Sequence, residues 1–286
     1  MTTNFRPPPP DSPPPELRYR RAFEFRRATR ELAQSRHIIG GLVVRQVRSQ
    51  YSQQVFGLAW AVLAPLAQMV VFTFLLNRVS GSTFATGGVP RPLFLYVGLT
   101  CWSFFSSSVS SASASLVGNP LLNKVYAPRE VFPLSQVASS GVDAIASAAL
   151  LPILFLWFGR WPSATIYWAP LLIVILIVFT IAISLAISAT TVYVRDLRSG
   201  LPLLLQLGLF LTPILYPIST LPARFRTLTM LLNPVAGVVE GLRNCLFYDK
   251  PPNLEYTLAA AVASVAYLFG AFVLFKRLET GFADVS

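Results

Sequence analysis

Residues 211–234 read LTPILYPISTLPARFRTLTMLLNP, from Leu211 to Pro234, and this stretch decides the fold more than any other part of the chain. It is apolar enough for a membrane, yet four prolines interrupt it: Pro213, Pro217, Pro222 and Pro234. Proline lacks the backbone N–H and clashes with the preceding helical turn, so a simple spanning helix would not contain this pattern. The stretch therefore predicts the end of one helix, followed by short pieces that re-enter the membrane or lie on its surface.

The composition around this stretch is that of an integral membrane protein. Of the 286 residues, 54% are hydrophobic and 12% are charged, whereas soluble domains carry about 25% charged residues. A helix needs about 20 residues to cross a hydrocarbon core of about 30 Å. We therefore predict an all-α transmembrane domain over residues 58–278, with six spanning helices near residues 58–77, 93–114, 133–157, 168–192, 200–217 and 254–275.

The distribution of basic residues predicts the orientation of the chain. Of the 23 lysines and arginines, 16 lie before the first span, in the loops after the second and fourth spans, and in the C-terminal tail. The other seven lie on the opposite side. Positive charge favours the inner side of a membrane, so both termini are predicted to be cytoplasmic, as an even number of spans requires. Since topology and anionic lipid account for the net charge of +11, the alternative of a nucleic-acid-binding surface is not favoured.

The first 57 residues divide into a tail and an amphipathic helix. Residues 1–36 contain runs of consecutive prolines, which favour extended chain that cannot pack a core. We predict a disordered cytoplasmic tail here, either a plain linker or a docking segment. Over residues 37–57, apolar side chains recur every four positions through Tyr51, while Arg45 and Arg48 occupy the polar side. This pattern predicts a helix in the cytoplasmic interface with its apolar face in lipid. Residues 279–286 form the C-terminal cytoplasmic tail.

Asp143 is the conspicuous ionisable residue within the predicted spans. A carboxylate at that depth is expensive unless it faces the interior of a bundle or a partner group, which makes it a candidate functional residue. Ser139, Ser140 and Ser147 are close in sequence and are predicted hydrogen-bonding partners. Two roles stay open for Asp143, a structural one through hydrogen bonds and a direct one in transport.

The chain lacks the motifs of common catalytic sites. The phosphate-binding pattern GxxxxGK[ST] does not occur, so the chain cannot hold and hydrolyse ATP by that mechanism. HExxH, GxSxG and CxxC are absent as well. Cys101 falls inside a predicted span and Cys245 outside, which indicates neither a disulfide framework nor a metal site. We therefore expect no catalytic residues, no metal and no cofactor in this chain.

A set of short motifs, in order along the chain, resembles one family of membrane proteins. Their order and spacing cover residues 42–284, although each motif alone is short. The chain is similar to the permeases of polysaccharide and polyol-phosphate exporters, the ABC-2 class with Wzm-like and teichoic-acid members. It departs from that pattern in the proline-rich extension and at Ala127, where an aromatic residue is common. The motifs are Arg45-x-x-Arg48-x-x-Tyr51, Gly57-Leu58-Ala59-Trp60, Gly98-Leu99-x-x-Trp102-x-Phe104-Phe105, Asn119–Arg129 (NPLLNKVYAPR), Tyr193–Leu197 (YVRDL), and Thr212–Pro217 with Asn233, Pro234, Glu240 and Arg243.

The resemblance implies a half-transporter in the bacterial inner membrane. Two copies of the permease form a channel, and two copies of a separate subunit, which binds ATP and Mg²⁺, dock on the cytoplasmic side. The loop between the second and third spans couples the two kinds of subunit. The implied cargo is a lipid-linked cell-envelope polysaccharide, and twenty arginines against three lysines suggest an actinobacterial galactan. The coupling residues expected from the resemblance are Asn119, Lys124, Val125, Tyr126, Pro128 and Arg129.

The region between Pro217 and Pro252 is 34 residues long and still apolar. That is too long for a turn, so short helices at the outer leaflet are predicted. In the family these helices look like an external gate. Glu240 and Arg243 are three residues apart on a predicted helix and could pair across one face; bracing of the gate and contact with sugar hydroxyls are the alternatives. The expected gate residues are Pro213, Tyr216, Pro217, Asn233, Pro234, Glu240 and Arg243.

Two other functions stay open from the residues alone. One is a membrane-embedded enzyme that acts on polyprenyl-phosphate sugars, which would require a cluster of carboxylates or histidines. The other is an ion-coupled secondary transporter in which Asp143 carries the proton or ion.

Overall fold

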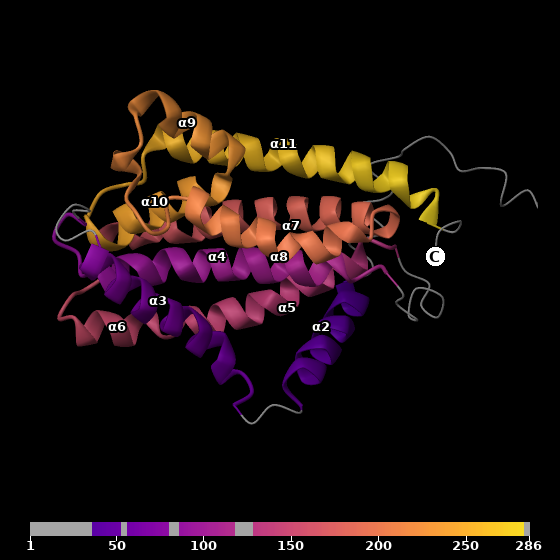
Figure 1. Cartoon of the computed structure of the whole chain (residues 1–286), viewed down its shortest axis with the longest axis horizontal. Coiled ribbons are helices and arrows are strands. Elements are labelled where there is room, and N and C mark those ends of the chain that lie inside the picture. Colours follow the sequence, from indigo (N-terminus) through magenta and orange to yellow (C-terminus); the bar gives the residue numbers. More distant parts are fainter. Residues whose placement is uncertain (1–35, 53–55, 80–85, 118–127, 283–286) are drawn as a thin grey trace, which may run out of the picture.

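The computed structural model describes residues 36–52, 56–79, 86–117 and 128–282, and these residues form a bundle of helices (Figure 1). No strand occurs in these ranges. The predicted tail and most of the predicted coupling loop lie outside the described residues. The elements are α2 (Arg36–Tyr51), α3 (Ala59–Val79), α4 (Arg91–Ser113), α5 (Val131–Ala148), α6 (Leu151–Trp157), η2 (Ala164–Trp168), α7 (Ala169–Tyr193), α8 (Asp196–Leu211), η3 (Ile218–Thr220), α9 (Ala223–Leu232), α10 (Pro234–Phe247) and α11 (Leu254–Glu279).

Five helical segments of the described chain are long and apolar enough to cross a membrane. They coincide with the first, second, third, fourth and sixth predicted spans. Helix α4 lies at the centre of the bundle and packs against α3, α5, α7, α8 and α10. Because it has neighbours on every side, side chains such as Leu93 and Leu99 are completely buried. The five segments are Ala59–Arg78, Arg91–Ser113, Val131–Trp157, Ala164–Tyr193 and Leu254–Glu279.

The fifth predicted span, residues 200–217, differs from the helix that the structure contains. Helix α8 begins earlier, at Asp196, and ends at Leu211 after 16 residues. At 1.5 Å per residue it is about 24 Å long, which is less than the roughly 30 Å of a hydrocarbon core. A single proline, Pro202, is accommodated inside α8, but Pro213 and Pro217 remove two backbone donors within five residues, and the helix ends before them. Residues 212–217 therefore form a corner and are not part of the helix.

The third predicted span consists of two helices, α5 and α6, separated by a short break at residues 149–150. Pro152, in the first turn of α6, cannot donate a backbone hydrogen bond to α5. The hydroxyl of Tyr96 in α4 donates to the carbonyl oxygen of Ser147 at 2.9 Å, next to this break. A polar group near the break is thereby satisfied inside the bundle.

Helix α2 shows the predicted amphipathic pattern but has a different neighbour. Arg45 and Arg48 are exposed, while Leu42, Val43 and Val47 are half-buried. This half-buried side packs against α5, so the apolar face is covered partly by protein and not by lipid alone. Figure 1 shows α2 and α3 converging at an angle beside α5. The helix ends at Tyr51 instead of at the predicted residue 57.

The region after the corner contains the predicted short helices, but α10 does not lie on the surface. It packs against α4, α7 and α11, and eleven of its 14 residues are buried. Two glycines allow this close packing: a Cβ at Gly237 would lie 2.9 Å from Ala260 Cβ, and one at Gly241 would lie 2.9 Å from Leu172 Cδ2. Helices α9 and α10 therefore form a re-entrant hairpin, with α9 along α11 and α10 inside the bundle (Figure 1).

Candidate functional site

The corner that follows α8 is held by polar contacts between segments far apart in sequence. Thr212 is completely buried, and its hydroxyl donates to the carbonyl oxygen of Gly208 at 2.7 Å. The side-chain amide of Asn233 donates to the Thr212 hydroxyl at 2.6 Å. Asn233 also caps α10, because its Oδ1 accepts from the amide of Val235 at 3.2 Å. The two predicted breaks, at Pro213 and at Asn233-Pro234, are thus joined to each other.

Arg243 of α10 holds the same corner from the other side. Its side chain is 1% exposed, although it carries a charge. Nη1 donates to the carbonyl oxygen of Pro213 at 2.8 Å, and Nη2 donates to that of Ile214 at 2.6 Å. Nε and Nη2 both donate to the carbonyl oxygen of Phe94 in α4, at 3.3 and 3.2 Å. One guanidinium therefore ties α10, α4 and the corner together.

The planar guanidinium group can hold these segments together because it presents several N–H donors in one plane. The guanidinium carbon also lies 3.5 Å from the centre of the Phe94 ring, a distance at which the ring face attracts a cation. The backbone of Gly98 permits this approach, since a Cβ there would lie 3.0 Å from both Arg243 Nη2 and Ile214 Cγ2. Of the roles considered for Arg243, the contacts correspond to bracing.

Arg243 does not form the predicted pair with Glu240 in the structure. Arg243 directs its donors to three backbone carbonyls: those of Pro213 and Ile214, which follow the end of α8 and have no helical partners, and that of Phe94 in α4. Burial raises the pKa of the Glu240 carboxyl, and the nearby charge of Arg243 partly opposes that rise. Glu240 thus lies near the guanidinium without being its main hydrogen-bonding partner.

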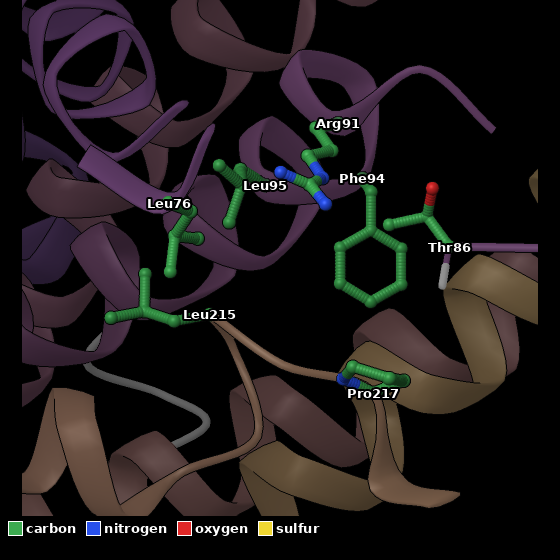
Figure 2. A pocket seen from close by; sticks show the side chains of 7 residues that line it. All are labelled: Leu76, Thr86, Arg91, Phe94, Leu95, Leu215 and Pro217. Atoms are coloured by element: carbon green, nitrogen blue, oxygen red, sulfur yellow. The ribbon is translucent and has the colours of Figure 1, made fainter. Parts of the chain in front are cut away.

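The outer surface of the corner is closely packed. Figure 2 shows Leu215 and Pro217 of the corner near Leu76 of α3 and Phe94 of α4. These residues surround a cavity of about 10 Å³, which is about the space of one water molecule. Tyr216 is half-buried, and its hydroxyl donates to the carbonyl oxygen of Leu211 at 3.2 Å, at the end of α8. Among the described residues, the predicted gate residue Pro217 therefore lines only a small cavity at the corner.

The end of the bundle at which α11 ends contains a second polar cluster, which the sequence patterns did not reveal. Glu130 precedes α5, is 3% exposed, and forms an ion pair with Lys276 of α11. Lys276 also pairs with Glu279 at 2.9 Å. Arg129 lies over the ring of Phe282, with its guanidinium carbon 5.4 Å from the ring centre. The end of the predicted coupling loop is therefore attached to the end of α11.

The structure describes two of the six predicted coupling residues. Pro128 and Arg129 are described, and both are half-buried. Asn119, Lys124, Val125 and Tyr126 lie outside the described residues. Glu130 could have been noticed as a carboxylate directly beside an apolar span. Its partner could not, because Lys276 is 146 positions later and looks like an ordinary basic residue at the end of a spanning helix.

Asp143 of α5 is the third polar group of interest, and its partners are not the predicted serines. The hydroxyl of Tyr51 in α2 donates to Asp143 Oδ1 at 2.5 Å, and Gln50 Nε2 donates to Oδ2 at 3.3 Å. Burial raises the pKa of the Tyr51 hydroxyl, and the hydrogen bond to the Asp143 carboxylate raises it further. The amphipathic helix is thus anchored to the bundle through its last residues. Arg45 and Arg48 take no part in this contact.

Comparison with known proteins gives a consistent result over most of the chain. The sequence model described as ABC-2 type transporter matches residues 39–247. An O-antigen export system permease protein RfbA of Myxococcus xanthus is 32% identical over 261 residues, which are 90% of this chain and 98% of that protein. A permease of the same name from Klebsiella pneumoniae is 27% identical, over 84% of this chain and 92% of that protein. A polysialic acid transport protein KpsM of Escherichia coli is 24% identical, over 91% and 97%.

Proposed function

The chain belongs to the ABC-2 type transporter family, and on that premise we propose that it is the channel-forming membrane subunit of an ATP-driven exporter of a lipid-linked cell-envelope polysaccharide. The observation that carries the proposal is the match to polysaccharide export permeases over nearly their whole length. The five long apolar helices supply a membrane domain of the required kind.

We propose that α8 supplies a sixth crossing despite its length. The end of α7 lies beside the end of α11, because the Tyr193 hydroxyl donates to the carbonyl oxygen of Leu278 at 2.7 Å. Helix α11 begins at the opposite end of the bundle (Figure 1). The chain between α7 and α11 must therefore cross from one side to the other, and α8 is the element that does so. Six crossings and the positive-inside rule support cytoplasmic termini and a bacterial inner-membrane location.

The ATPase is proposed to be a separate subunit, since the sequence contains no phosphate-binding loop. Two copies of this chain and two copies of that subunit would form the exporter, with ATP and Mg²⁺ bound to the ATPase. Closure of the ATPase pair would press on the coupling loop that ends at Arg129. The ion pair of Glu130 with Lys276 offers a mechanical path, because it connects this loop to α11.

The far end of α11 completes this path toward the outer side. Helix α11 packs against both α9 and α10, the two arms of the re-entrant hairpin. Movement of α11 would therefore displace the hairpin relative to the corner that Arg243 braces. We propose the hairpin and the corner as the outer gate, closed in the present conformation. The resting gate would prevent leakage, and ATP-driven motion would open it for the glycan.

The first test is isolation of this chain from its native membrane together with any ATPase subunit, followed by reconstitution into lipid vesicles. We expect a stable complex that hydrolyses ATP and moves a lipid-linked glycan outward. Isolation of the chain without any ATPase, under conditions that preserve a known exporter complex, would contradict the proposal. Mass analysis of the exported glycan tests the finer assignment, for which the arginine-rich composition favours an actinobacterial galactan.

A further inference from the structure

A cavity of about 330 Å³ lies between α2, α3 and α5, away from the corner and its gate residues. Its lining consists of Gln50, Tyr51, Trp60, Ala61 and Asp143. Its volume is within the range of roughly 300–1,000 Å³ that ligand pockets have, enough for about one or two sugar rings. The cavity therefore has the size of a site for a small group and is not a packing defect of the kind that leaves room for one water.

Two hydrogen bonds from one face of α5 hold the walls of this cavity. Asp143 receives the Tyr51 hydroxyl and so fixes the end of α2. Ser147 is one helical turn further along α5, and its hydroxyl donates to the carbonyl oxygen of Ala61 at 2.6 Å, which fixes the start of α3. Asp143 and Ser147 therefore fix the positions of α2 and α3 on either side of the cavity. The cavity is a built feature of the fold.

The chemistry of the lining is that of carbohydrate recognition. An aromatic ring offers a flat apolar face, and Trp60 is 51% exposed with its ring held edge-on by Phe56, at 5.7 Å between ring centres. An ionised carboxylate has about four acceptor positions, and Asp143 uses two of them on Tyr51 and Gln50. The remaining positions can accept hydrogen bonds from hydroxyl groups in the cavity.

The position of the cavity in the membrane narrows the choice of ligand. Asp143 lies near the middle of the apolar segment Val131–Trp157, so its open acceptors favour a polar occupant over an apolar one. A lipid tail alone would not supply one. A phosphate group would meet the negative charge of Asp143, whereas neutral sugar hydroxyls would not be repelled.

From this geometry we propose that the cavity binds a neutral sugar ring of a lipid-linked glycan, with the ring against Trp60, its hydroxyls on Asp143, and its lipid still in the bilayer. The proposal rests on the proposed export function, for which the cavity would be an early contact on the path from lipid to channel. Trp60 and Asp143 contact the sugar directly, and Tyr51 positions Asp143.

The test uses a substituted thiol inside the cavity of the full-length chain in lipid nanodiscs. Ala61→Cys places a thiol on the wall while its carbonyl stays bonded to Ser147. The native Cys101 and Cys245 are buried, so the wild-type chain is the control for background labelling by N-ethylmaleimide. The probe is dodecyl maltoside, a neutral disaccharide on a single chain. Octaethylene glycol monododecyl ether, with the same chain and a neutral headgroup that lacks sugar rings, is its matched control.

We expect dodecyl maltoside to slow labelling of the Ala61→Cys thiol about five-fold, as partial occupancy by a weak ligand would, and octaethylene glycol monododecyl ether to leave it unchanged. Trp60→Leu or Asp143→Asn, added to Ala61→Cys, should abolish the protection. Trp157→Leu should preserve it, because Trp157 is exposed at the end of α6, outside the cavity. Monodisperse elution of each variant confirms that it is folded.

Equal protection by both detergents would overturn the proposal, since the cavity would then bind the alkyl chain. Protection that survives both Trp60→Leu and Asp143→Asn would overturn it too. A thiol that is never labelled, with or without detergent, would overturn it as well, because the space would then be closed to a small ligand. None of these measurements requires ATP hydrolysis. The cavity proposal can therefore fail while export is observed, and sugar binding in the cavity can be observed while export fails.

Discussion

Replacement of Arg243 by methionine is the strongest test of the structural account of the corner. The substitution keeps an unbranched, flexible side chain, which is shorter than that of arginine, and removes every donor. The carbonyl oxygens of Pro213 and Ile214, which lie outside the helices, then lose their partners. Since an unsatisfied buried carbonyl costs about 1–3 kcal/mol, the two together cost about 2–6 kcal/mol. Removal of a buried charge offsets part of this.

We therefore expect a net loss of about 3 kcal/mol in the free energy of unfolding, which at about 2–4 °C per kcal/mol corresponds to a fall in Tm of about 6–12 °C. Arg243→Lys should fall between wild type and Arg243→Met, because an ammonium retains charge and donors but lacks the planar fork. The assay is thermal unfolding of the protein in lipid nanodiscs, followed by intrinsic fluorescence and by loss of monodisperse elution.

Arg226→Met is the matched control. Arg226 also donates to two carbonyl oxygens, those of Leu221 and Ser219, both at 2.9 Å, but part of its side chain is open to solvent. Water can replace those donors, so we expect a change in Tm of no more than about 2 °C. If Arg243→Met melts as close to wild type as Arg226→Met does, the guanidinium does not brace the corner and the reasoning is refuted.

Three further predictions concern the other polar contacts. Lys276→Met should destabilise the protein by about 3–5 kcal/mol because it leaves the buried carboxylate of Glu130 unpaired. The exchanged pair, Glu130→Lys with Lys276→Glu, should recover part of that loss in thermal unfolding. Failure to recover any stability would argue against a direct ion pair. Tyr51→Phe should cost about 1.5–3 kcal/mol, the value of a hydrogen bond to a charged group, and Asp143→Asn should add little once Tyr51 is replaced; fully additive losses in Tm would show that the two groups act independently. Asn233→Ala should cost about 1–2 kcal/mol through loss of the cap of α10 and should loosen the corner, which faster limited proteolysis between α8 and α10 would report; unchanged cleavage would count against the link between the two breaks.

Much of the architecture was predictable because membrane insertion places strong demands on local sequence. A spanning helix needs a long apolar run whatever its neighbours are, so five of the predicted spans coincide with helices of the structure. A break near Leu211 was predictable for a related reason, since Pro213 and Pro217 together remove two backbone donors within five residues, whereas the single Pro202 is accommodated inside α8. The end of α8 was predicted six residues too late, at residue 217 instead of Leu211, because residues 212–217 are apolar, and apolarity alone does not separate a helix from a buried corner.

The candidate site was predictable only in part. The importance of Asp143 and Arg243 follows from their chemistry, since ionisable groups among apolar residues need partners. Their partners were predicted wrongly, because nearby serines and the carboxylate three positions away are neighbours in sequence, whereas Tyr51 and the carbonyl oxygens of Pro213 and Ile214 are neighbours only in space.

The sequence by itself determined that the chain is a multi-pass membrane protein, where its long helices lie, and that a helix must end within the proline-rich stretch that begins at Leu211. Each of these follows from local covalent chemistry, namely the solubility of side chains in lipid and the missing N–H of proline. Only the tertiary structure decided that α10 re-enters the bundle, that Arg243 braces the corner, and that Asp143 anchors α2. These depend on which buried donors and acceptors meet, and such pairings are selected by the packing of the whole chain.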